Sequence, residues 1–157
     1  MAKVYLETSV ISYLASAPSR DIIVAAHQQI TRDWRDYRRK RFELVTSGEV
    51  VNEISDGDPV EAQRRLELVG GISLLAADES ALELAKLLVA TRTIPKKAST
   101  DALHIAIAAV NGIDFLLTWN CKHLANANIR RKIDETCVSA GAPSVVICTP
   151  DQLMEDE

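Results

Sequence analysis

Short apolar runs alternate along the chain with longer segments in which apolar residues recur at helical spacing. The runs have the length and content of short buried strands, and they lie at residues 4–6, 42–46, 72–75, 115–119 and 145–148. The segments between them predict helices at 8–14, 21–41, 48–55, 59–69, 79–93, 101–111, 122–124 and 129–139. A last helical turn, or a frayed end, is expected within residues 151–157.

This alternation favours an α/β fold, because strands separated by helices form a parallel sheet with helices packed on its faces. We expect one domain over residues 1–157, an α/β/α sandwich with a mostly parallel five-stranded sheet. Segment 101–111 is apolar all round apart from three polar residues, so it should be a central, buried helix. Thr8 or Ser9 is expected to cap the first helix, and Ser99 or Thr100 the central one.

Composition agrees with an ordinary globular domain and excludes several other classes. The 157 residues are 47% hydrophobic and 25% charged, with a net charge of −4, which disfavours disorder and a uniformly basic surface. No stretch is apolar enough to span a bilayer or to open a signal peptide. A cytoplasmic protein without membrane association is therefore expected. The three widely spaced cysteines predict small buried side chains rather than disulfides or a zinc site.

Four acidic or amide side chains stand where the carboxyl ends of parallel strands, and hence ligands, should gather: Glu7, Glu53, Asp101 and Asn120. Each also has a structural explanation, as a helix cap, a dipole partner, a surface acid or a turn residue. Carboxylates held close together repel, and a divalent cation removes that repulsion. Oxygen ligands alone favour Mg²⁺ or Mn²⁺ over Zn²⁺. These positions therefore indicate a metal-dependent phosphodiesterase or nuclease.

At these same positions the sequence resembles the PIN domain family, including the VapC-type toxins of toxin–antitoxin operons. The resemblance is carried by four short motifs in the family's order, at 4–11, 50–54, 99–106 and 116–120. It implies a PIN-like fold and a ribonuclease that depends on Mg²⁺ or Mn²⁺, often as a homodimer, and it suggests an antitoxin protein as partner. The family usually has Asp at its first and fourth positions, where this chain has Glu7 and Asn120.

The resemblance implies a role for each matched residue. Asp101, Glu7 and Glu53 would hold the metal directly or through water, and Asn120 would orient a water or a phosphate. The hydroxyls of Thr8 and Ser9 would face the metal's waters. His104 and His123 are either general acids or hydrogen-bonded structural histidines.

One segment of this acidic chain is strongly basic. Residues 31–41 hold six Lys or Arg residues against two Asp, with two aromatic residues interleaved. They predict contacts to RNA phosphates through Arg35, Arg38, Arg39 and Lys40, and stacking of bases on Trp34 and Tyr37. The alternative is a solvated helix face whose aromatic residues pack on the core or on a second copy.

The sequence leaves two classes of function open. The first is the RNA endonuclease; the second is a catalytically weak or inactive PIN-like module that binds nucleic acid or a protein partner. A phosphoryl-acceptor enzyme fits less well, because no predicted strand ends in Asp. The glycine-rich loops that bind nucleotides are also missing.

Overall fold

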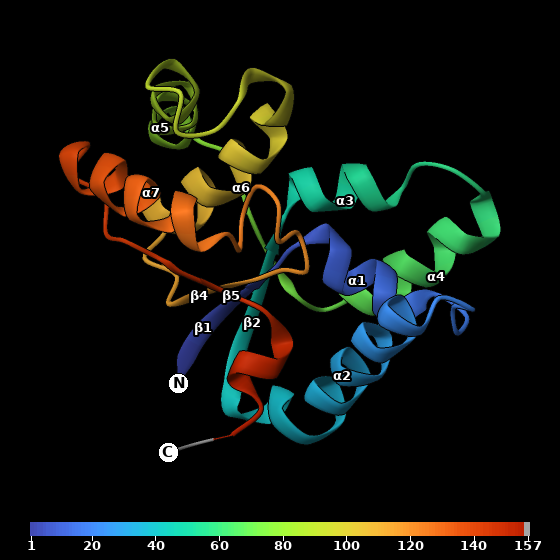
Figure 1. The fold of residues 1–157 in the computed structure, drawn as a ribbon. Coiled ribbons are helices and arrows are strands. Elements are labelled where there is room, and N and C mark those ends of the chain that lie inside the picture. Colours follow the sequence, from blue (N-terminus) through green and yellow to red (C-terminus); the bar gives the residue numbers. More distant parts are fainter. Residues whose placement is uncertain (156–157) are drawn as a thin grey trace.

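A computed structural model describes residues 1–155 and contains a five-stranded parallel sheet near its centre (Figure 1). The strands are β1 (Ala2–Leu6), β2 (Phe42–Ser47), β3 (Ser73–Leu75), β4 (Phe115–Leu117) and β5 (Val146–Cys148). Their order across the sheet is β3-β2-β1-β4-β5, and all four neighbouring pairs are parallel. The predicted α/β fold class is therefore confirmed.

Helices lie on both sides of this sheet, as an α/β/α sandwich requires. Figure 1 shows α1, α2 and α4 on one side and α5, α6 and α7 on the other. The helices are α1 (Thr8–Ala15), α2 (Ile22–Arg38), α3 (Gly48–Ile54), α4 (Pro59–Val69), α5 (Glu79–Ala90), α6 (Ser99–Val110) and α7 (Ala127–Ser139). Three 3₁₀ turns accompany them: η1 (Arg39–Arg41), η2 (Lys96–Ala98) and η3 (Pro150–Leu153).

The core is centred on β1 and α6. Val4 and Tyr5 of β1 are fully buried, because strands pair with β1 on both edges and helices cover both of its faces. Most of α6 is buried as well, including His104 and Ile105. The apolar composition of segment 101–111 therefore predicted its central place correctly.

Several predicted boundaries are wrong, each for a local reason. The strand predicted at 115–119 ends at Leu117, because a turn begins there: the Thr118 hydroxyl accepts the Asn120 N–H, and the Asn120 side chain accepts the His123 N–H. Residues 121–124 form turns rather than a helix. Neither Ser99 nor Thr100 caps α6; the N-cap is Ala98, because η2 runs directly into the helix.

The prediction for the cysteines is correct for Cys137 and Cys148, which are buried, and wrong for Cys121, which is exposed. Cys121 lies in the turns after β4, where the backbone runs along the surface. The predicted terminal turn is η3, while Asp156 and Glu157 lie outside the described residues. Within residues 1–155, no helix has both the length and the apolar character needed to cross a bilayer.

Candidate active site

The parallel register brings polar residues from three strands to one edge of the sheet. Leu6 pairs with Leu117, and the Glu7 N–H donates to the Leu117 carbonyl at 3.1 Å. On the other side of β1, the Thr46 hydroxyl donates to the Leu6 carbonyl at 2.8 Å. The residues that follow β1 and β4 therefore meet the end of β2 at the edge where open α/β sheets bind ligands.

Glu7 is the most deeply buried carboxylate of this edge, with 5% of its surface exposed. Its Oε1 accepts a 2.6 Å hydrogen bond from the Thr118 hydroxyl, a short one from the Ser9 hydroxyl and a 3.1 Å bond from the Ser9 N–H. The last bond makes Glu7 the N-cap of α1, so the expectation that Thr8 or Ser9 caps this helix is wrong. Within residues 1–155 these bonds all use Oε1, which leaves Oε2 available to a ligand.

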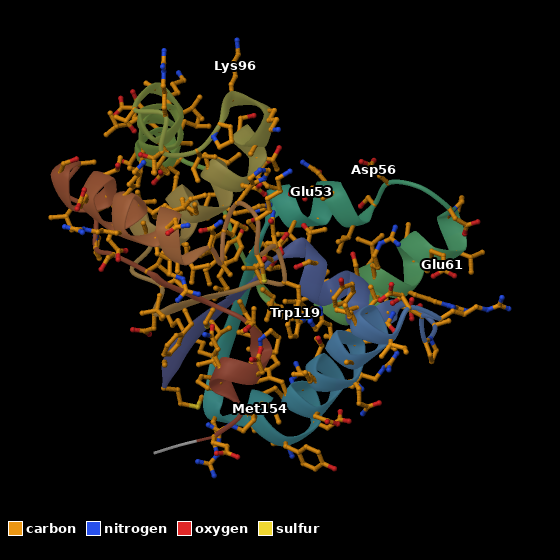
Figure 2. All side chains as sticks on the ribbon, viewed as in Figure 1. Glu53, Asp56, Glu61, Lys96, Trp119 and Met154 are labelled. Atoms are coloured by element: carbon orange, nitrogen blue, oxygen red, sulfur yellow. The ribbon has the colours of Figure 1, made fainter. Side chains whose placement is uncertain are left out.

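Glu53 reaches the same edge from α3 (Figure 2) and joins a chain of buried polar groups. Its Oε1 lies 2.5 Å from His104 Nε2, and its Oε2 accepts a 3.0 Å bond from the Thr8 hydroxyl. The other ring nitrogen of His104 lies 2.7 Å from the Tyr5 hydroxyl, which in turn lies 2.6 Å from Ser47 Oγ. Because a carboxylate only accepts hydrogen bonds, His104 must carry a proton on Nε2.

This chain of hydrogen bonds sets the charge states at the edge. Burial by itself raises the pKa of Glu53, but the hydrogen bond and charge of His104 and the hydroxyl of Thr8 outweigh it. The pKa of Glu53 therefore lies below its ordinary value, and the group is a carboxylate at neutral pH. Burial also raises the pKa of Tyr5, so its phenol remains protonated.

Asp101 and Asn120 are connected through a second histidine. Asp101 lies in the first turn of α6, and its Oδ2 is 3.3 Å from His123 Nδ1. The Asn120 side chain accepts a 3.1 Å hydrogen bond from the His123 backbone N–H. Both predicted site residues therefore contact His123, which lies in the turns after β4. The sequence allowed either a general-acid role or a structural role for this histidine.

The structure brings together two of the three predicted metal ligands. One ligand atom from each of Glu7, Glu53 and His104 lies within 4.8 Å of the others. Asp101 is not a member of this group, which is the only such group in residues 1–155. Its role as a metal ligand therefore stays a prediction. Two carboxylates, one with a free oxygen, suit a cation that keeps several waters, as Mg²⁺ does.

Three residues that hold these groups were missed as site residues: Tyr5, Ser47 and Thr118. Their sequence signal is weak, because Tyr5 looks like an ordinary strand residue and Ser47 like an ordinary helix cap. Thr118 belonged to a recognised motif but had no assigned role. Only the packing of β1 against α6 shows that the Tyr5 hydroxyl contacts His104.

The basic segment divides into buried and exposed residues. Arg38 is buried and donates from Nε to the Leu153 carbonyl at 3.1 Å, with its guanidinium 5.9 Å from the Phe42 ring. Arg39 and Lys40 are exposed, and Arg35 is half-buried beside Asp36. Of the two aromatic residues, Trp34 belongs to the core and Tyr37 is exposed.

Comparison with known proteins supports the fold. No protein-family model matches the sequence, and no curated protein matches it either. The structure is similar to a chain in the crystal structure of VapBC2 from Rickettsia felis bound to a DNA fragment from their promoter. That match has a TM-score of 0.61 and 13% identity, and covers 94% of this chain and 98% of the other.

A second similar structure is VapBC-1 from nontypeable Haemophilus influenzae, with a TM-score of 0.55 and 14% identity over 95% of this chain and 98% of the other. The chain has a PIN-type fold. The fold that the sequence motifs implied is thus confirmed over nearly the whole chain. At this level of identity the likeness concerns the fold alone, so the chemistry of the candidate site rests on its own residues.

Proposed function

We propose that this protein is a metal-dependent ribonuclease that hydrolyses phosphodiester bonds in single-stranded or structured RNA. The observation that carries the proposal is the approach of Glu7 and Glu53 to within 4.8 Å at the carboxyl edge of a parallel sheet. Two carboxylates at that distance repel each other unless a cation or a proton lies between them. His104 and the Thr8 hydroxyl lower the pKa of Glu53 against the effect of burial, so this group stays a carboxylate that a cation can bind.

The cofactor would be Mg²⁺ or Mn²⁺. Glu7, through its free Oε2, and Glu53 would hold the ion, with Asp101 acting through water. Such an ion, when bound, activates water and stabilises the charge that develops at phosphorus.

The protein's own groups hold the carboxylates and position the substrate. Ser9 and Thr118 fix the Glu7 carboxylate by hydrogen bonds to Oε1. Thr8 and His104 fix Glu53 in the same way. In this proposal the amide of Asn120, which carries no charge, orients a water or a phosphate oxygen. Side chains fixed in advance lower the cost of organising the site when the substrate binds.

A specific observation favours the second candidate, a PIN-type module that binds RNA with little or no catalysis. Both oxygens of Glu53 already have hydrogen-bond partners, and Asn120 supplies no carboxylate at the fourth motif. With fewer free acidic oxygens, the affinity for a divalent cation falls. The two candidates therefore differ in metal-dependent cleavage and not in the fold.

A cleavage assay tests the proposal. The protein and its Glu53→Gln and Asp101→Asn variants are incubated with labelled single-stranded RNA in Mg²⁺, Mn²⁺ or EDTA. We expect cutting only with metal, and a loss of at least about 100-fold in both variants, because each removes a negative charge from the site. Glu67→Gln, which removes an exposed carboxylate from α4, is the matched control and should cut normally.

The outcomes separate the two candidates. Cleavage that persists in EDTA, or in both site variants, would contradict the metal-dependent mechanism. If no protein cuts RNA but all of them bind it, the module that binds without cutting is the correct description. Thermal unfolding of each variant shows whether lost activity reflects chemistry or folding.

We further propose a role as the toxin of a toxin–antitoxin pair, with an antitoxin protein as partner and a homodimer as the assembled form. The proposal is supported by the PIN-type fold, which this chain shares with chains in structures of VapBC proteins. It is also supported by the motif resemblance at Glu7, Glu53, Asp101 and Asn120.

A further inference from the structure

Three aromatic rings from different parts of the chain gather beside the candidate active site. They belong to Tyr13 of α1, His27 of α2 and Trp119, which follows β4. The rings of His27 and Trp119 are stacked, with centroids 4.0 Å apart and planes 11° apart. The Tyr13 ring lies 6.4 Å from each of the others. All three residues are half-buried, so part of the cluster meets solvent.

Hydrogen bonds fix the Trp119 ring relative to the carboxylates. Its indole N–H donates to the hydroxyl of Thr31, a fully buried residue of α2, at 2.7 Å. Its backbone N–H donates to Ser9 Oγ at 2.9 Å, and Ser9 in turn binds Glu7. Figure 2 shows Trp119 beside α1 and α2, near the middle of the molecule. The ring is therefore held in a set orientation, one residue away from both Thr118 and Asn120.

We propose that the stacked pair of His27 and Trp119 is a binding subsite for an unpaired base of a single-stranded polynucleotide. A planar base adds to an existing stack of rings at little cost when those rings are already fixed. This subsite rests on the proposed function, because the base it binds would lie next to the phosphate at the Glu7 edge. Base stacking is thereby assigned to Trp119 and not to Trp34, which is buried in the core.

Tryptophan fluorescence provides a direct test. The chain has two tryptophans, and a Trp34→Phe background leaves Trp119 as the only reporter. The buried indole nitrogen of Trp34 has no hydrogen-bond partner in residues 1–155, so this replacement breaks no hydrogen bond. The probes are a single-stranded RNA oligonucleotide and an abasic ribose-phosphate chain of the same length, both added in EDTA. We expect RNA to quench Trp119 and the abasic chain to leave its emission unchanged.

Substitutions at His27 distinguish the effect of aromatic stacking on RNA affinity from the effect of side-chain size. His27→Phe keeps an aromatic ring and should bind RNA within about two-fold of the parent, whereas His27→Leu, similar in size, should bind about five-fold more weakly or worse. Neither change should alter affinity for the abasic chain. Ile22→Ala removes an exposed apolar side chain from the same helix, outside the cluster, and should leave RNA affinity unchanged.

Three results would overturn the subsite. They are equal quenching by the abasic chain, equal RNA affinity of the Phe and Leu variants, and a loss in Ile22→Ala as large as in His27→Leu. Because binding is measured in EDTA, the test does not depend on catalysis. A protein that binds bases at Trp119 but never cuts RNA would refute the nuclease and keep the subsite.

Discussion

At the level of single residues, burial decides what a side chain of a given type can do. The buried thiols illustrate this: burial raises the pKa of Cys137 to about 11 and that of Cys148 to about 12. The thiolate is the reactive form of cysteine, so both groups are nearly inert at neutral pH. Cys121 is exposed on the turns after β4 and does not share this protection.

Alkylation by iodoacetamide tests this difference. In native protein near pH 8 we expect Cys121 alone to be modified, and all three cysteines after unfolding in urea. Since both buried pKa values lie above neutral pH, their thiolate fraction, and with it their reactivity, should increase as pH rises toward these values. Peptide mapping identifies the labelled residues. Rapid native labelling of Cys137 would show that α7 is less tightly packed than described.

At the level of elements, Glu7 connects the folding of a helix to the chemistry of the site. The same carboxylate accepts the Ser9 N–H at the start of α1 and stands among the candidate metal ligands. A carboxylate suits the N-terminus of a helix, where the backbone dipole is positive. Helix capping and metal binding therefore both require a negatively charged oxygen in a fixed place at this position.

Two substitutions at Glu7 separate these roles. Glu7→Ser retains a side-chain oxygen that can cap α1, and Glu7→Ala has none. We expect Glu7→Ser to be more stable than Glu7→Ala by about 1 kcal/mol, the usual value of an N-cap. We expect both to lose metal-dependent RNA cleavage. Urea unfolding measures the first effect, and the cleavage assay measures the second. Equal stability of the two variants would mean that the cap contributes nothing to α1.

At the level of the whole molecule, charge is distributed unevenly. The net charge is −4, yet Arg35, Arg39 and Lys40 concentrate positive charge around the end of α2 and η1. Arg38 is turned inward to Leu153, so it serves the packing of η3 on α2. The exposed residues of this group, together with the aromatic cluster at the other end of α2, would allow one helix to contact both phosphates and a base.

Charge reversal tests this surface. We expect the double variant Arg39→Glu/Lys40→Glu to bind single-stranded RNA more weakly at low salt, and its affinity to depend less steeply on salt concentration. The double variant Lys86→Glu/Lys132→Glu, at exposed sites on α5 and α7, changes the net charge by the same amount and is the control. Filter binding over a series of salt concentrations measures both quantities. Unchanged affinity in the Arg39→Glu/Lys40→Glu variant would assign the basic segment to a solvated surface.

Much of the fold could be predicted from the sequence, because its elements are defined by local patterns. The apolar runs predicted all five strands, and the composition of segment 101–111 predicted the buried place of α6. Most errors arose at the ends of elements, where a single hydrogen bond decides the boundary, and the helix predicted at 122–124 is a series of turns. Glu7 caps α1 because its carboxylate accepts the Ser9 N–H, and no local sequence pattern distinguishes Glu7 from Thr8 as the capping residue.

The sequence by itself determined the order of strands and helices and the types of side chain at the carboxyl edge, since both depend on neighbours along the chain. The tertiary structure alone decided which of those side chains meet. It joined Glu53 to His104, 51 residues away, and Trp119 to Thr31, 88 residues away. It also turned Arg38 inward. Such contacts depend on how helices pack across the sheet, and packing distance is not encoded in any local pattern of hydrophobic and polar positions.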